Sequence, residues 1–210
     1  MASISEHNTE EDLHGRLSMW RAFSGDTGRV AIVLKIPWFA EGLLDGMNAL
    51  NLFFSPVVYL TEDDYQEEFH QIISNVTNSH DFLCSVNRSK IINSIFNMLL
   101  IGTVCLKHCG FREEQEWRVM HFPNLRHSPL MKAETKVIGG IPQKIYKLPL
   151  DATVAPALAD IDLSCIFDRL IIGPTQYSWP MYEAFSEALS NIGIQDAHTR
   201  ICISNIPIRT

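Results

Sequence analysis

The sequence predicts an α+β fold in a single domain, a mixed, mainly antiparallel sheet with packed helices. The chain has 210 residues, of which 46% are hydrophobic and 20% are charged, as in an ordinary globular protein. Segments with apolar residues three and four positions apart are interspersed with short runs rich in β-branched residues. The pair Gly139-Gly140 separates two such runs, which predicts a hairpin and therefore antiparallel strands.

The first half of the chain is predicted to be mainly helical. Helices are expected over residues 10–23, 38–50, 61–76 and 89–108, and strands over residues 30–36 and 57–60. Thr61 is a good N-cap because Asp63 and Asp64 follow in the first turn, and Gly110 is expected to stop the last helix. The apolar run 91–106 contains polar residues and is shorter than the ~20 residues that cross a bilayer. It therefore predicts a buried helix.

The second half is predicted to build most of the sheet. Strands are expected over residues 114–122, 134–138, 143–150, 170–172 and 200–204, and helices over residues 163–168 and 180–191. No internal repeat or clear linker interrupts the sequence.

Charge is unevenly distributed along the chain. The net charge is −7, which argues against binding DNA over the whole surface, because phosphate contacts need clustered bases. Residues 105–150, however, contain eight basic residues and only four acidic ones. The basic residues are Lys107, Arg112, Arg118, Arg126, Lys132, Lys136, Lys144 and Lys147. An anionic ligand is expected on this basic segment, and the alternative is a solvated face with no ligand.

Cysteine content and the N-terminus predict a cytoplasmic protein with no membrane role. The five cysteines lack the spacing of a disulfide framework, and residues 1–12 carry acids where a secretory signal would carry bases. Cys105, His108 and Cys109 lie close in sequence but lack the further ligands that a tetrahedral zinc site needs. No metal site is therefore predicted.

Several motifs resemble a known bacterial family. Ser5-Glu6, Met19-Trp20 and Glu114-Gln115-Glu116-Trp117-Arg118 occur in this order, and with the stretches around Tyr59 and Gly173 they extend over most of the chain. Together they resemble the family called domain of unknown function 2971. Its members usually carry a further N-terminal stretch, so the resemblance implies that this chain is incomplete there.

The order of motifs in that family is similar to that of ADP-ribosyltransferases, which implies an NAD-dependent activity. In a strand, Glu114, Glu116 and Arg118 would project from one face, and Trp117 from the other, into the core. A carboxylate stabilises the cationic centre that forms when nicotinamide leaves NAD. The resemblance makes Glu116 and Glu114 the candidate catalytic residues.

The remaining candidates concern cofactor and partners. NAD is the expected cofactor, and the candidate cofactor-binding residues are Ser5, Trp20, Tyr59, Arg118 and Arg126. Arginine suits the pyrophosphate because it donates two parallel hydrogen bonds. One alternative is a non-enzymatic protein that binds an anionic partner, an acidic protein or RNA, through residues 105–150. Another is a structural remnant of a longer gene. The partner is unknown from sequence; a small-molecule nucleotide and a second copy of the chain are both candidates.

Overall fold

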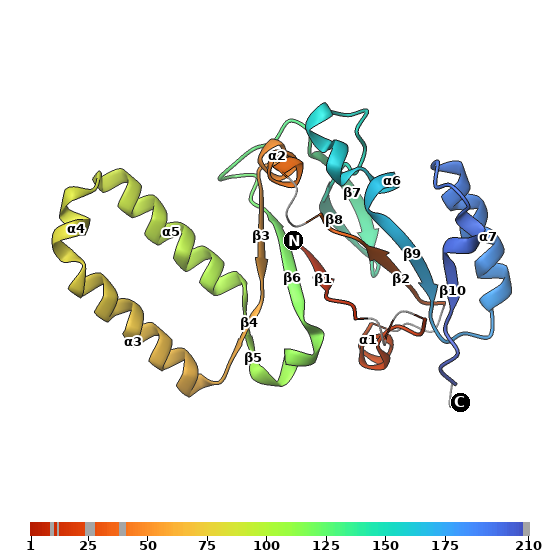
Figure 1. The fold of residues 1–210 in the computed structure, drawn as a ribbon, viewed down its shortest axis with the longest axis horizontal. Helices are drawn as coiled ribbons and strands as arrows, with labels where there is room; N and C mark the ends of the chain where they lie inside the picture. The colour runs from red at the N-terminus through yellow and green to blue at the C-terminus, as the bar shows by residue number, and fades with distance from the viewer. Residues whose placement is uncertain (9–10, 12, 24–27, 38–40, 208–210) are drawn as a thin grey trace. The chain divides into compact units, whose positions relative to one another are not determined.

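The computed structural model describes residues 1–8, 11, 13–23, 28–37 and 41–207. The chain forms two compact units, and each is built from separated segments (Figure 1). The first unit comprises Met1–Glu6 and Phe53–Met120, and the second unit comprises His7–Leu52 and His121–Thr210. The α+β class predicted from sequence is confirmed, with several small, mostly antiparallel sheets among the described residues. The single-domain organisation stays a prediction.

The first unit contains a three-stranded sheet and a two-stranded one. The order β1-β6-β3 joins β1 (Ala2–Ser5), β6 (Glu116–His121) and β3 (Leu52–Pro56), with β1 antiparallel to β6. The second sheet pairs β4 (Val58–Leu60) in parallel with β5 (Leu106–His108). Strands β1 and β3 were not predicted.

The helices of the first unit are α3 (Glu62–Asn78), α4 (His80–Ser85) and α5 (Arg88–Val104). Thr61 caps α3 as predicted, and Thr61 and Asp64 form a reciprocal capping box. The predicted helix 89–108 is too long, because residues 106–108 instead hydrogen-bond to β4 as a strand. The prediction that residues 91–106 form a buried helix is also wrong, since α5 has no buried residue.

Two apolar cores are formed by the described residues of the second unit. One core joins β9 (Phe167–Ile172) to β10 (Ile201–Ile203) and α7 (Ser178–Asn191), with β2 (Val30–Leu34) completing the sheet order β10-β9-β2. The other core packs α2 (Glu41–Ala49) on the 3-10 helix η3 (Pro156–Ile161). Leu158, Ile171 and Ile172 are fully buried.

Smaller elements of the second unit fit the sequence less closely. The predicted helix 10–23 shortens to α1 (Leu17–Ala22), and residues 10 and 12 lie outside the described residues, as do residues 38–40 of the predicted helix 38–50. The predicted helix 163–168 ends early as α6 (Leu163–Ile166), because Phe167 already belongs to β9.

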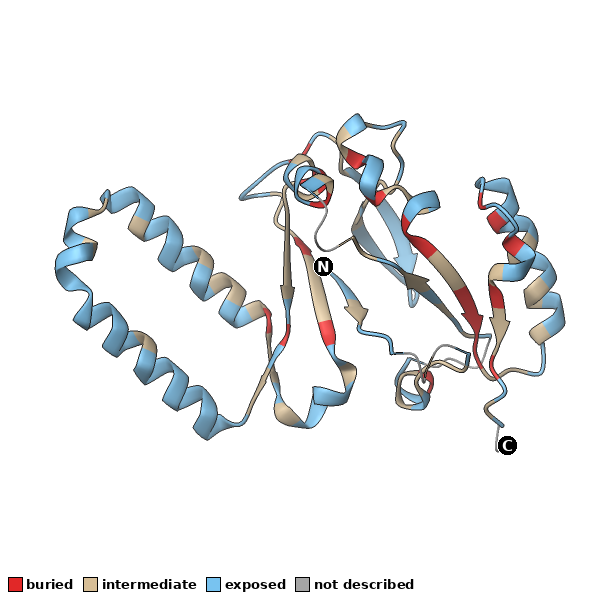
Figure 2. Cartoon of the chain, in the orientation of Figure 1, coloured by how far each residue is buried: buried red, intermediate tan, exposed pale blue. Residues whose placement is uncertain are grey.

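The hairpin predicted at Gly139-Gly140 is confirmed. Strands β7 (Lys132–Ile138) and β8 (Ile141–Lys147) pair antiparallel in the second unit, with Ile138 opposite Ile141. Both glycines have positive φ, at 56° and 81°, which a two-residue hairpin turn requires. The ribbon is largely exposed (Figure 2).

Candidate functional site

Glu116 is the centre of an ionic network in the first unit. Its side chain is only 7% exposed. Arg118 grips the carboxylate with two parallel hydrogen bonds, from Nε to Oε1 at 3.0 Å and from Nη2 to Oε2 at 3.1 Å. Lys107 Nζ lies 2.8 Å from Oε2, and the Ser3 hydroxyl donates to Oε1. One buried carboxylate is thus shared by two cations and a hydroxyl.

The backbone around Glu116 is equally engaged. Its N–H donates to the Tyr59 hydroxyl at 2.8 Å, and its carbonyl accepts from the N–H of Val57 at 2.8 Å. Arg118 Nη1 also donates to the carbonyl of Val104, at the C-terminal end of α5. A cation is favourable there because the last carbonyls of a helix carry partial negative charge. The network therefore ties β1, β5 and β6 to the end of a helix.

These contacts determine the charge state of the cluster. Burial by itself would raise the pKa of Glu116, but hydrogen bonds from Arg118, Lys107 and Ser3 lower the pKa to about 2. Lys107 loses solvent as well, yet its bonds to Glu114 and Glu116 raise its pKa. Both partners are therefore ionised at neutral pH, and Glu116 is not a proton donor there.

Glu114 does not lie on the strand of Glu116, contrary to the sequence prediction. It ends the 3-10 helix η2 (Cys109–Glu114), and Gln115 then takes a left-handed conformation with φ of 44°. Glu114 still joins the cluster, because its Oε2 lies 2.5 Å from Lys107 Nζ and its carbonyl accepts from the Ser5 hydroxyl.

Trp117 is not fully buried, so the prediction that it anchors the strand in the core is wrong. It lies on the face of β6 opposite Glu116, as the alternation of a strand predicts. There it stacks on Phe54, with ring centroids 5.0 Å apart, and its indole N–H donates to Glu6 Oε1 at 2.7 Å.

Five predicted site residues are therefore joined in one network: Ser5, Tyr59, Glu114, Glu116 and Arg118. The other two, Trp20 and Arg126, belong to the second unit. Trp20 is 7% exposed and donates to the carbonyl of His14 at 2.8 Å. Ser3 was not among the predicted site residues, although in a strand Ser3 and Ser5 lie on one face.

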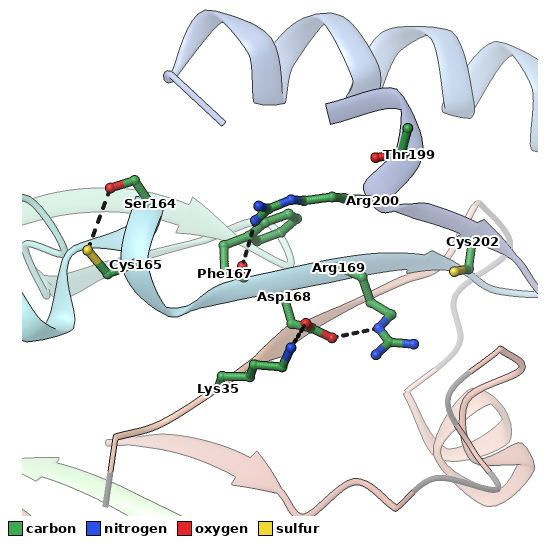
Figure 3. A pocket seen from close by; sticks show the side chains of 9 residues that line it. All are labelled: Lys35, Ser164, Cys165, Phe167, Asp168, Arg169, Thr199, Arg200 and Cys202. Carbon is green, nitrogen blue, oxygen red and sulfur yellow. Dashed lines mark hydrogen bonds and ion pairs between the residues drawn. The ribbon is translucent and has the colours of Figure 1, made fainter. Parts of the chain in front are cut away.

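A polar depression of about 460 Å³ lies in the second unit (Figure 3). Asp168 binds two cations there, with Lys35 Nζ at 2.5 Å and Arg169 Nε at 2.7 Å. Arg200 donates to the carbonyl of Phe167 at 3.0 Å. Three cations and one carboxylate leave an excess of positive charge, which attracts anions. The adjacent charges of Asp168 and Arg169 in an otherwise apolar strand were the available sequence signal.

The described residues contain no group of three or more His, Cys, Asp or Glu side chains placed to hold a metal ion. Cys105 is buried, with its Sγ 3.8 Å from Met120 Sδ, and it packs as an apolar residue. None of the described helices has the length and apolar character needed to cross a membrane.

Comparison with known proteins adds one finding. Residues 19–119 match the model of a family described as protein of unknown function (DUF2971). That match supports the resemblance to the family. It includes Tyr59, Glu114, Glu116 and Arg118, but covers a shorter stretch than the resemblance described above. No match was found among curated proteins or among solved structures.

Proposed function

We propose that the protein is a binding protein whose β7–β8 hairpin contacts the phosphates of a nucleic acid. The observation that carries this proposal is a set of four exposed lysines on a two-stranded ribbon, in a chain whose net charge is −7. The Glu116 network supports a catalytic function less well than the hairpin supports binding. Lys107, Arg118 and Ser3 already occupy the Glu116 carboxylate.

The strand register distributes the hairpin lysines over both faces. Lys132 lies opposite Lys147, and Lys136 shares their face because it is four residues along β7 from Lys132. Lys144 lies on the other face, with its Nζ 5.2 Å from the centre of the Tyr146 ring. Glu134 pairs with both Lys136 and Lys147. Four lysines and one glutamate leave the ribbon positively charged.

A cationic two-stranded ribbon fits nucleic acid better than a small anion. The major groove of B-DNA is wide enough to admit a two-stranded β-ribbon. Lysine acts as a point charge on phosphates and carries no sequence information by that contact. The proposal therefore implies binding that depends strongly on salt and weakly on sequence.

Replacing Lys132, Lys136, Lys144 and Lys147 by glutamine is expected to weaken binding to a DNA duplex. Each phosphate contact releases counterions, so each lost lysine contact should make the negative slope of log affinity against log salt less steep by about 0.9. Fluorescence anisotropy of a labelled duplex, measured over a salt series, gives both the affinity and the slope.

The Glu134→Gln variant provides a control of opposite sign. It frees Lys136 and Lys147 from their carboxylate, so binding should become tighter. Arg21→Gln, at an exposed base on α1 in the same unit but outside the hairpin, should leave the slope unchanged. Equal affinity of the fourfold variant and the wild type would disprove the proposal. If the protein binds polyglutamate but no nucleic acid, the proposed partner is wrong, and an acidic protein takes its place.

A second candidate is the ADP-ribosyltransferase-like activity, with NAD as cofactor. It is favoured by the gathering of Ser5, Tyr59, Glu114, Glu116 and Arg118 in one network. For Glu116 to stabilise an oxocarbenium-like centre, its carboxylate has to exchange Ser3 or Lys107 for the ribose.

If this candidate is correct, NAD should stabilise the protein by about 2.7 kcal/mol at a hundredfold excess over its Kd. Thermal unfolding with and without NAD measures this, and chromatography of the mixture detects released nicotinamide. Adenosine diphosphate is the matched control, because it contains the pyrophosphate without the nicotinamide ribose. If saturating NAD changes neither the unfolding temperature nor the nicotinamide content, the candidate is rejected.

A further inference from the structure

The helical arm of the first unit, residues 62–104, exposes most of its apolar side chains (Figure 2). None of the helices α3, α4 and α5 has a buried residue. Each of the two long helices carries an exposed apolar row at helical spacing. The rows are Tyr65, Phe69, Ile73 and Val76 on α3, and Ile92, Ile95, Phe96 and Leu99 on α5.

Such rows are unusual on the surface of a monomer. Large exposed apolar patches mark interaction surfaces in soluble proteins. Most of the stability of a helix in a protein comes from packing of its apolar face, yet neither α3 nor α5 has a buried residue. Full burial of each large apolar side chain contributes roughly 1.5–3 kcal/mol. A partner that covers the arm would therefore stabilise it strongly.

The charges of the arm are separated along its length. Helix α3 begins at the base of the arm, and α5 begins at the tip beyond α4 (Figure 1). The base of the arm, residues 62–68, carries five acidic residues and no Lys or Arg. The acidic residues are Glu62, Asp63, Asp64, Glu67 and Glu68. The tip carries Arg88, Lys90 and one acid, Asp81, so its net charge is +1. All eight of these residues are exposed.

We propose that the arm is covered by the arm of a second copy of this chain, antiparallel across a two-fold axis. Because the long helices have equal length, an antiparallel pair brings each tip to the base of the other arm. Arg88 and Lys90 then lie near the acidic segment 62–68 of the partner subunit at both ends. A parallel pair would instead place acids against acids, which costs free energy.

The charge pattern selects this occupant over others. A membrane surface is disfavoured because the inner leaflet is negatively charged and would repel the acidic base of the arm. The interface is isologous, so each copy supplies both the acidic and the basic patch. The inference does not depend on the hairpin or on NAD, because it uses only residues 62–104.

Two charge-reversal variants test the arrangement in combination. R88E/K90E places acids at both contacts of its homodimer, and E67K/E68K places bases there. Each variant alone should weaken dimerisation at least tenfold. An equimolar mixture should restore a dimer, because the tip of each variant then faces an opposite charge on the base of the other. Analytical ultracentrifugation measures the dissociation constants.

The E183K/E187K variant is a matched control, since these acids are exposed on α7, outside the arm. It should dimerise like the wild type. Circular dichroism verifies that every variant retains its helices. A wild-type protein that is monomeric at every concentration tested overturns the proposal, whether or not it binds lipid vesicles. Failure of the mixture to restore a dimer also overturns it, as does normal dimerisation of both charge variants alone.

Discussion

Replacing Glu116 by glutamine is expected to destabilise the first unit by about 3 kcal/mol at neutral pH. The change leaves Arg118 and Lys107 in a site where the carboxylate is 7% exposed, and removal of one partner from a buried ion pair costs about this much. This loss of stability is expected independently of any role of Glu116 in catalysis, because it follows from the ion pairs of its carboxylate. Urea unfolding measures the loss.

The pH dependence of this effect has a definite sign. Folding lowers the pKa of Glu116 from 4.5 to about 2. This shift adds on the order of 3 kcal/mol to the free energy of unfolding at neutral pH. That stability is fully present above the unfolded pKa of 4.5 and is lost as the pH falls toward 2. The difference between the wild type and the variant should therefore be largest above pH 4.5 and shrink toward pH 2.

Glu113→Gln is the control for the Glu116 experiment. Glu113 is exposed and lies three residues away, so its replacement should change the free energy of unfolding by less than about 0.5 kcal/mol. If Glu116→Gln unfolds at the wild-type urea concentration across this pH range, then the network contributes nothing to stability.

Replacing Trp20 by alanine is expected to destabilise the second unit by about 3–5 kcal/mol. The indole fills a space bounded by two glycines. A Cβ built on Gly15 would lie 2.6 Å from Trp20 Cζ2, and one on Gly173 would lie 2.9 Å from Trp20 Cε3. No side chain can occupy either position while the indole is in place, so its removal leaves a cavity. Urea unfolding again measures the loss.

Two tryptophan variants complete this test. Trp20→Phe keeps most of the apolar volume but removes the hydrogen bond to His14, which is worth about 1 kcal/mol. Trp179 is 67% exposed, so Trp179→Ala should change stability by less than about 1 kcal/mol. A Trp20→Ala protein as stable as Trp179→Ala would show that the indole has no role in the core.

Local signals in the sequence predicted those parts of the fold that depend on neighbouring residues. The capping box of Thr61 and the turn at Gly139-Gly140 each involve residues within three positions of one another. Strand alternation likewise placed Glu116 and Arg118 on one face of β6. These predictions are correct because the interactions that determine each local structure lie within one short segment of the sequence.

The failures have a different physical origin. Residues 106–108 continue an apolar helical pattern, but hydrogen bonds to β4, more than forty residues earlier, make them a strand. Glu114 was placed on the strand because Gln115 gives no sign of its left-handed backbone, which is uncommon for a residue other than glycine. Ser3 reaches Glu116 across 113 positions. Tertiary contacts over such separations have no local sequence signature.

The position of β1 in the chain also affects the order of events during synthesis. Ser3 leaves the ribosome 113 residues before Glu116, its hydrogen-bonding partner. At roughly 5–20 residues per second, β1 waits about 6–23 s for the strand with which it pairs. Until then the charge of Lys107, which is translated nine residues before Glu116, cannot be neutralised by that carboxylate. The first unit is therefore completed late, when both ends of this long loop are available to close it.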